Sequence, residues 1–316
     1  MGASTRTVPF AGFTLAVGSA ASFALSGVFA SALIAAGWSA GAAAAARIVC
    51  AAIVLAPPTA VLMRGRWPLL RRAWRAVVLF GVLAVAGCQL AYFLAIAYIP
   101  PSIALLIEFM GPVLLMLWLW GRTRIPPGAV TLAGAALAVA GLATVSLGGG
   151  EGADALHPLG VAFALVAAIG NAAYYAAGAT SDHGIAPLPF VGLGLAVAAI
   201  LLMIACASGA LPFAVSAAPV RIAGAELPAV VAVAGMVLVS TVIAYVLGVA
   251  ASRRLGATVA SFTGYSEPLF GILWTIVLLA LVPTGRQWLG AVLIVAGVVA
   301  VKLGELLSAR TRRSAR

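Results

Sequence analysis

The stretch IALLIEFMGPVLLMLWLWGRTRIPPGAVTLAGAALAVAG, residues 103–141, returns in altered form as VASFTGYSEPLFGILWTIVLLALVPTGRQWLGAVLIVAG, residues 259–297. A shift of 156 positions aligns the two stretches without a gap. The matched pairs include Pro112 with Pro268, Trp118 with Trp274, Pro127 with Pro283, Gly134 with Gly290 and Gly141 with Gly297. Matches of Pro, Trp and Gly at one offset indicate that the chain contains two copies of one unit.

The composition indicates that both copies lie in a membrane. Of the 316 residues, 64% are hydrophobic and 8% are charged, and the mean hydropathy is +1.19. A soluble domain carries about 25% charged residues, so this chain has too few charges to cover a water-facing surface. The apolar runs are continuous and do not alternate, which favours helices over a β-barrel. We therefore expect an all-α integral membrane protein.

Hydropathy, with Gly, Pro and Arg as punctuation, divides the chain into ten transmembrane helices of about 20 residues. The predicted spans are 10–32, 40–63, 74–97, 101–120, 127–147, 158–180, 187–209, 228–250, 257–281 and 286–307. Each copy holds five spans, an odd number, so the second copy enters the membrane from the opposite side. We expect two inverted five-helix repeats around a central cavity. The repeats occupy residues 10–147 and 158–307, and residues 308–316 form a basic cytoplasmic tail.

The arginines predict the orientation, because basic residues gather in cytoplasmic loops. With the N-terminus inside, the cytoplasmic side receives Arg64, Arg66, Arg71, Arg72, Arg75, Arg122, Arg124, Arg253, Arg254, Arg310, Arg312, Arg313 and Arg316. The opposite side receives mainly Glu151, Asp154, Arg221, Glu226 and Arg286. Both termini are therefore predicted to be cytoplasmic, and the first apolar segment is expected to be a retained span. The net charge of +11 follows from this bias, so we expect no nucleic-acid partner.

Ionisable groups inside a span are costly and usually face a partner or a cavity, and three candidates stand out: Arg47, Glu108 and Glu267. At about 1.5 Å per residue, Arg47 and Glu108 both lie roughly 10 Å below the outer surface. Gln89 lies roughly 12 Å down on the third span. We expect Arg47 and Glu108 to pair across the cavity mouth, with Gln89 nearby. The alternative is that Arg47 snorkels outward while Glu108 is protonated or bonded to backbone.

The third intramembrane charge is Glu267, which lies close to the midplane, about ten residues into its span. It directly precedes Pro268. A proline frees the backbone carbonyl one turn earlier, and we expect helix breaks at Pro112 and Pro268. A carboxylate beside such a break could hold a proton or a substrate ammonium group. The alternative is a protonated Glu267 that only hydrogen-bonds a neighbouring helix.

Polar and aromatic side chains form a second set of candidate site residues, with a weaker sequence signal than the charged ones. Asn171, Tyr174 and Tyr175 fall on one face of the sixth span at spacings of three and four, and they could line a substrate cavity. Further candidates for the lining are Tyr245, Tyr265, Trp118 and Trp274. Each aromatic residue could equally pack in the bundle or anchor at an interface.

No motif for soluble chemistry is present. The sequence has no phosphate loop of the form GxxxxGK[ST], no HExxH and no paired metal-ligand cluster. We therefore expect no enzyme activity, no catalytic residue, no cofactor and no bound metal. The cysteines are interpreted as small packing residues in or beside apolar runs: Cys50, Cys88 and Cys206. His157 and His183 lie in connections and are expected to be solvated.

The spans, the repeat and two segments together resemble the EamA family of the drug/metabolite transporter superfamily. The segments are LIEFMGP (Leu106–Pro112) and ASFTGYSEPLFGILW (Ala260–Trp274), and the resemblance covers nearly the whole chain. It implies a basket of helices around a central cavity, in an inner-membrane exporter of amino acids, other metabolites or drugs. Many members carry a Gly-Glu pair at the end of each fourth span. This chain has no carboxylate in Trp120–Pro127 or Leu279–Gly285, so no role of that residue is carried over.

We therefore expect a multi-pass secondary active transporter of the cell inner (cytoplasmic) membrane. It would export amino acids or other small metabolites by alternating access. Glu108 and Glu267 would carry the proton or an ammonium group, and Arg47 would pair with them or bind a carboxylate. Its partners would be a small-molecule metabolite, the lipid bilayer and protons, and it would act as a monomer or a homodimer. An alternative function on the same scaffold is that of a non-transporting membrane protein, such as a lipid scramblase or an assembly partner. Such a protein would have a sealed centre or a lateral groove.

Overall fold

The computed structural model describes residues 8–95, 98–99, 101–146, 157–279 and 284–314. Three charged residues of the predicted topology, Glu151, Asp154 and Arg316, lie outside this part of the chain. For Arg310, Arg312 and Arg313 the helical backbone is described and the side chains are not.

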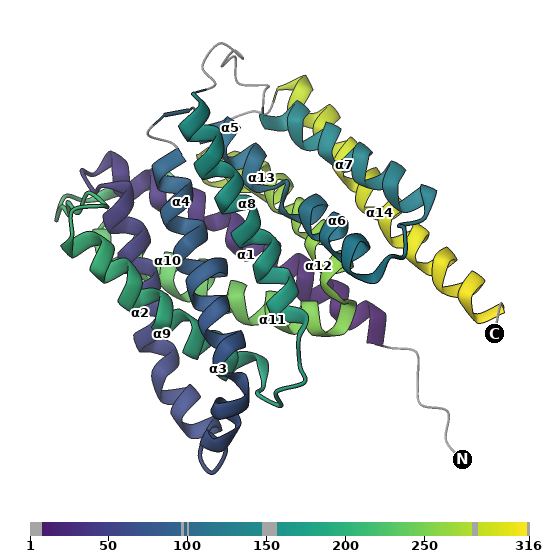
Figure 1. Cartoon of the computed structure of the whole chain (residues 1–316). Helices are drawn as coiled ribbons and strands as arrows, with labels where there is room; N and C mark the ends of the chain where they lie inside the picture. Colours follow the sequence, from purple (N-terminus) through teal and green to yellow (C-terminus); the bar gives the residue numbers. More distant parts are fainter. Residues whose placement is uncertain (1–7, 96–97, 100, 147–156, 280–283, 315–316) are drawn as a thin grey trace.

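Helices make up nearly all of the described chain (Figure 1). The predicted first repeat contains α1 (Val8–Ala35), α2 (Ala40–Leu62), α3 (Leu70–Leu79), α4 (Cys88–Ala95), α5 (Pro101–Glu108), α6 (Gly111–Thr123) and α7 (Ala129–Ser146). The predicted second repeat contains α8 (Pro158–Ala179), α9 (Pro187–Ala207), β1 (Val220–Ile222), β2 (Ala225–Leu227), α10 (Ala229–Val237), α11 (Ala244–Leu255), α12 (Ala257–Thr263), α13 (Glu267–Leu279) and α14 (Gly285–Ser314). Short 3₁₀ segments are η1 (Trp67–Leu69) and η6 (Gly264–Ser266), and π-helical segments are η2 (Phe80–Gly87) and η5 (Leu238–Ile243).

Each predicted span lies on one helix or on consecutive helices of the described chain. Six stretches are long and apolar enough to cross a membrane: Phe10–Ala35, Ala40–Leu62, Trp67–Ala95, Pro158–Ala179, Pro187–Ala207 and Ala229–Leu255. Shorter apolar helices cover Ala129–Thr144 and Trp288–Val301. The predicted spans 101–120 and 257–281 are interrupted near their middle, so neither contains one unbroken helix of spanning length. The fold is an all-α membrane fold in which six spans are clear from length and composition.

The two π-helical segments lie at corresponding places in the two halves. The π segment η2 ends at Gly87 and η5 ends at Ile243, which are separated by the repeat offset. In η5 the hydroxyl of Thr241 donates a hydrogen bond to the carbonyl of Met236, five residues earlier, at 2.8 Å. The sequence predicted ordinary α-helix here, because a continuous apolar run has no periodicity that distinguishes a π turn from an α turn.

The packing partners of the two halves mirror one another. Helix α1 of the first half packs against η5, α11 and α13 of the second. Helix α8 of the second half packs against η2, α4 and α6 of the first. The remaining long helices pair across the halves, α2 with α9 and α7 with α14. Each half therefore places its first helix among the helices of the other.

Helices α7 and α14 approach one another backbone to backbone along one edge of the molecule (Figure 1). A Cβ added to Gly134 would meet the carbonyl of Gly297, and one added to Gly297 would meet the amide of Ala138. A Cβ on Gly141 would likewise meet the carbonyl of Gly290. Small residues let membrane helices gain packing contacts at this short separation, so the pair depends on glycine at these positions.

A short hairpin folds the connection after α9 against the helices. Strands β1 and β2 pair antiparallel, with Val220 opposite Leu227. The turn residues Ala223 and Gly224 have φ values of 52° and 78°, a combination typical of a tight hairpin turn. The N–H of Ala223 donates to the carbonyl of Leu278 near the end of α13, at 3.1 Å. The connection between the predicted spans 187–209 and 228–250 therefore contains a hairpin that is anchored to α13.

The prediction that His183 is solvated is wrong. Only 8% of His183 is exposed, and its ring stacks on Phe190 with centroids 5.1 Å apart. Its Nδ1 accepts a hydrogen bond from the N–H of Ile185 at 3.2 Å. The guanidinium of Arg253 packs over the same Phe190 ring and donates to the carbonyl of Ile185 at 2.6 Å. The sequence did not reveal this because Arg253 comes from a distant helix. His157, by contrast, is exposed as expected.

The contact between α7 and α14 predicts that replacing a helical glycine with alanine lowers the stability of the protein. Alanine is the better helix former, yet we expect Gly134→Ala to destabilise the protein by about 1–3 kcal/mol, because its methyl group would press on the α14 backbone. The apparent melting temperature of the purified protein in detergent measures the effect. The matched control is Gly27→Ala in α1, where a Cβ meets no atom within 4 Å. Equal melting temperatures for the two variants would contradict the close contact.

The buried imidazole predicts a loss of stability in mild acid. Burial, and then the positive charge of Arg253, lower the pKa of His183 below its ordinary value of 6.5. Below that pH the unfolded chain takes up a proton that the folded chain resists, so stability falls as the pH falls. We expect His183→Asn to show a smaller decrease in melting temperature between neutral and mildly acidic pH. His157→Asn serves as the control and should keep the wild-type pH dependence.

Candidate functional site

The fourth and ninth predicted spans are interrupted at equivalent positions. Helix α5 ends at Glu108 and, after a turn, α6 begins at Gly111, next to Pro112. In the other half, α12 leads through the 3₁₀ segment η6 into α13, which begins with Glu267 and Pro268. Because proline has no N–H, the carbonyl four residues before it lacks an α-helical partner. Each interruption therefore lies just before its proline, and each carries one of the two intramembrane carboxyl groups.

The structure brings the three intramembrane charges into one cluster. Arg47, Glu108 and Glu267 are each partly buried, and their charges act on one another. Arg47 comes from α2, Glu108 from the end of α5 and Glu267 from the start of α13. The cluster therefore combines helices from both halves.

The predicted direct pair between Arg47 and Glu108 is not formed in this conformation. In the described part of the chain, the direct ion pair joins Arg221 to Glu226 in the hairpin, at 3.9 Å. Glu108 instead accepts a hydrogen bond from the thiol of Cys88, with Sγ and Oε1 3.3 Å apart. The depth estimate placed the two residues at one level, but it did not fix how each helix is rotated about its axis.

Arg47 faces a group of aromatic rings. Its guanidinium lies beside the hydroxyl of Tyr245, and its buried Nε has no hydrogen-bond partner among the described residues. The Tyr245 ring packs edge-on against Phe23 and Tyr174, with centroids 4.9 and 5.6 Å apart. Phe80 and Tyr175 pack on Tyr174 at 5.9 and 4.8 Å. The aromatic cluster consists of Phe23, Phe80, Tyr174, Tyr175 and Tyr245.

The polar candidates of the sixth and third spans lie near the same region. Asn171 packs against Gly111 at the start of α6, and its buried Oδ1 has no hydrogen-bond partner in the described chain. Gln89 is half-buried in α4, directly after Cys88. The predicted face of α8 therefore points inward, with Asn171 toward α6 and Tyr174 toward the aromatic cluster.

The rings of three aromatic candidates do not pack on the aromatic cluster. Tyr265 is fully buried and packs against other rings of the interrupted spans. Trp118 is 51% exposed, with the guanidinium of Arg122 over its ring. The indole N–H of Trp274 donates to the carbonyl of Ala21 in α1, at 2.9 Å. These residues pack or anchor helices and do not line the pocket described next.

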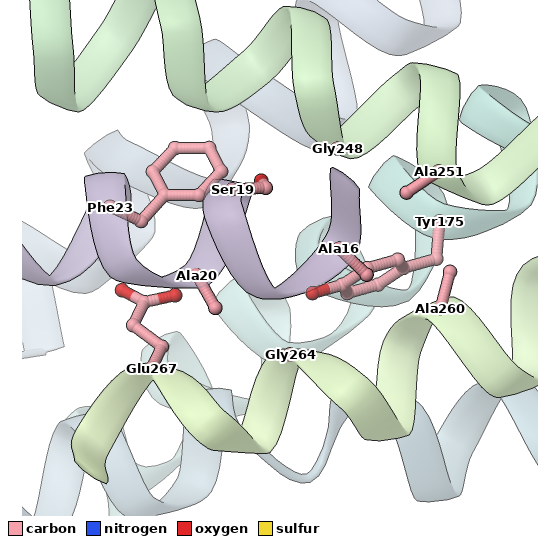
Figure 2. Close-up of a pocket in the computed structure, with 10 residues that line it drawn as sticks. All are labelled: Ala16, Ser19, Ala20, Phe23, Tyr175, Gly248, Ala251, Ala260, Gly264 and Glu267. Atoms are coloured by element: carbon pink, nitrogen blue, oxygen red, sulfur yellow. The ribbon is translucent and has the colours of Figure 1, made fainter. Parts of the chain in front are cut away.

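A small pocket lies beside Glu267, between α1 and the interrupted span of the second half (Figure 2). Its lining consists of Ala16, Ser19, Ala20, Phe23, Tyr175, Gly248, Ala251, Ala260, Gly264 and Glu267. Figure 2 shows the Glu267 carboxylate directed toward α1, with the Tyr175 ring entering from the other end. The free volume is about 10 Å³, close to what one water molecule needs. This pocket is therefore too small for a metabolite in this conformation.

The sequence did not single out two contributors to the site. Cys88 was interpreted as a packing residue, and its contact with Glu108 depends on how α4 is rotated against α5. The first span supplies Ser19, whose hydroxyl donates to the carbonyl of Ala244 at 2.7 Å. A serine in an apolar helix gives no signal that separates a site residue from a packing residue. Among the described residues, His, Cys, Asp and Glu form no group of three that could hold a metal ion.

Comparisons with known proteins agree with this architecture. The model of the EamA-like transporter family matches residues 10–147 and again residues 158–303. The curated "Uncharacterized inner membrane transporter YicL" of Salmonella typhimurium (strain LT2) is 23% identical over 237 residues, 74% of this chain and 75% of that protein. A protein of known crystal structure is similar over 95% of this chain and 99% of its own, with a TM-score of 0.71 and 21% identity. That last likeness concerns the fold alone.

The charged cluster predicts that substitutions at its members are not additive. Arg47→Gln leaves two carboxyl groups without their cation, so we expect a lower melting temperature. Adding Glu108→Gln removes one of the opposing charges and should restore part of the loss, a coupling of about 0.5–3 kcal/mol. The double-mutant cycle is measured in detergent. The exposed pair Arg221 and Glu226 is the control, and we expect its cycle to show less coupling. Additive losses at Arg47 and Glu108 would contradict a shared cluster.

Proposed function

The chain belongs to the EamA-like transporter family, and on that premise we propose that it exports amino acids or other small metabolites as a proton-coupled secondary active transporter. The resemblance seen in the sequence is confirmed by the match to both halves. The family consists of transporters and not of enzymes, so the chain is a membrane transporter with a small-molecule substrate. The substrate class, the direction of transport and the coupling to protons are the proposal.

The observation that carries the proposal is the charge balance of the cluster. Arg47 supplies one positive charge, and Glu108 and Glu267 supply two negative charges when both are ionised. An uncompensated charge inside an apolar bundle is costly. A proton or a substrate cation bound at one carboxylate removes the excess. Because either a proton or a substrate cation is sufficient, the two ligands compete for the same carboxylate. This competition couples outward movement of the substrate to inward movement of a proton.

Mirrored packing supports an alternating-access mechanism. We propose that residues 10–147 and 158–307 are two repeats with inverted topology. The first helix of each half lies among the helices of the other, so the two halves can exchange roles without a new kind of contact. The interruptions before Pro112 and Pro268 divide each fourth span in two. They are natural hinges, because a few residues at element ends can absorb a rotation.

The proposed location is the cytoplasmic membrane of the cell, with both termini inside. The bias of exposed arginines supports this orientation, and the Salmonella relative is named an inner membrane transporter. Arg64, Arg66, Arg71, Arg72 and Arg75 are all exposed around one turn of the bundle. A basic segment at that place suits the anionic cytoplasmic leaflet. We propose that the unit of function is a monomer or a homodimer.

Transport by purified protein in liposomes tests the proposed function. With an imposed pH gradient, we expect uptake or release of at least one labelled amino acid or amine, and we expect Glu267→Gln to reduce it to the level of empty liposomes. The matched control is Glu226→Gln, which removes an exposed carboxylate in the hairpin and should leave transport intact. No movement of any tested solute, or unchanged transport by Glu267→Gln, would refute the proposal. Lipid flipping by both variants would identify a scramblase instead.

A further inference from the structure

The pocket beside Glu267 has the chemistry of a cation site. One end of the pocket carries the Glu267 carboxylate, and the Tyr175 ring enters from the other (Figure 2). The hydroxyl of Ser19, which already donates to a backbone carbonyl, keeps lone pairs that can accept a hydrogen bond. The lining therefore offers one negative charge and two hydroxyl acceptors, with no positive side chain among its residues.

Of the two carboxyl groups, Glu267 is the one free to bind a ligand. Glu108 accepts a hydrogen bond from Cys88. No hydrogen bond or direct ion pair joins the Glu267 carboxylate to another of the described residues. Glu267 also lies at the pocket wall, and Glu108 does not belong to the lining. A buried carboxylate without a partner is costly, so Glu267 is expected to hold either a proton or a cation.

The size of the pocket restricts which cation fits. Six of its ten lining residues are alanine or glycine, and these small side chains come from helices of both halves. A Cβ on Gly264 would collide with the hydroxyl of Tyr175, so this glycine lets the phenol enter. With a free volume of about 10 Å³, the pocket accepts a group of water size. A primary ammonium group has this size and carries three N–H donors. Each methyl group added to the nitrogen removes a donor and increases the bulk.

We propose that the Glu267 pocket binds the primary ammonium group of the transported solute and excludes fully methylated ammonium groups. The substrate class is therefore primary amines, including amino acids. Binding exchanges one cation for one proton. The protonated Glu267 releases its proton to water, and the ammonium group enters with its N–H groups directed at the carboxylate and the Tyr175 hydroxyl. This inference rests on the proposed transport function for its role in the cell, but binding itself can be measured without transport.

Proton release on binding is the direct test. Purified protein in weakly buffered detergent solution is titrated with ammonium, methylammonium and tetramethylammonium chloride, with sodium chloride as the ionic-strength reference. A pH indicator and the melting temperature report binding. We expect ammonium and methylammonium to release up to one proton per chain and to raise the melting temperature. Tetramethylammonium should bind at least about tenfold more weakly than methylammonium.

Two substitutions connect the response to the pocket. Glu267→Gln should abolish proton release, and Glu226→Gln should leave it intact. Ala20→Gly widens the pocket and should reduce the preference for methylammonium over tetramethylammonium. Ala24→Gly is the matched control, because Ala24 is buried on the same helix and is not part of the lining. A tetramethylammonium response equal to that of methylammonium would overturn the size limit. Proton release that survives Glu267→Gln would overturn the site.

The outcomes separate this inference from the proposed function. Glu267-dependent transport of neutral or acidic solutes, without proton release by small ammonium ions, would refute the ammonium site and support the proposed transport function. Ammonium-driven proton release at Glu267, without transport of any solute in liposomes, would support the binding site and refute the proposed transport function.

Discussion

Two carboxyl groups share one guanidinium inside an apolar bundle, and this imbalance constrains the rest of the molecule. Water solvates neither Glu108 nor Glu267 well, so each needs a proton, a donor or a cation. Cys88 supplies a donor to Glu108. Arg47, held against the aromatic cluster beside Tyr245, acts on both carboxyl groups from a distance. The remaining charge at Glu267 is the one that we propose is met by an exchangeable proton or cation.

Irregular backbone surrounds this cluster in both halves. The π segment η2 ends directly before Cys88, and η5 ends two residues before Tyr245. The interrupted spans place Glu108 and Glu267 at their breaks. Unsatisfied backbone groups are tolerated at membrane depth only where protein covers them or where they line a cavity. The departures from α geometry therefore gather at the site, and the outer helices α7 and α14 stay regular.

Hydropathy and the repeat were sufficient to predict an all-α membrane fold and to find the three charged residues of the cluster. Because each helical residue adds a fixed rise, the position of a residue along its span gives its depth in the membrane, and Arg47 and Glu108 were placed at the same depth. This position does not give the rotation of a helix, which side-chain packing sets. Hence the direct ion pair was expected, and the thiol contact of Cys88 was not. The burial of His183 was missed for a related reason, because Phe190 and Arg253 enclose it from other helices.

The glycines between α7 and α14 also bear on the origin of the chain. Gly134 meets Gly297, and Gly141 meets Gly290. Gly134 therefore contacts the repeat counterpart of Gly141, and Gly141 contacts the repeat counterpart of Gly134. The same reciprocal pattern occurs in an isologous interface between two identical subunits. Such a two-fold pattern fits the proposal that the two halves are inverted repeats of one five-helix unit. The two halves differ in the interior, because the counterpart of Glu108 at the repeat offset is Gly264 and the counterpart of Glu267 is Gly111.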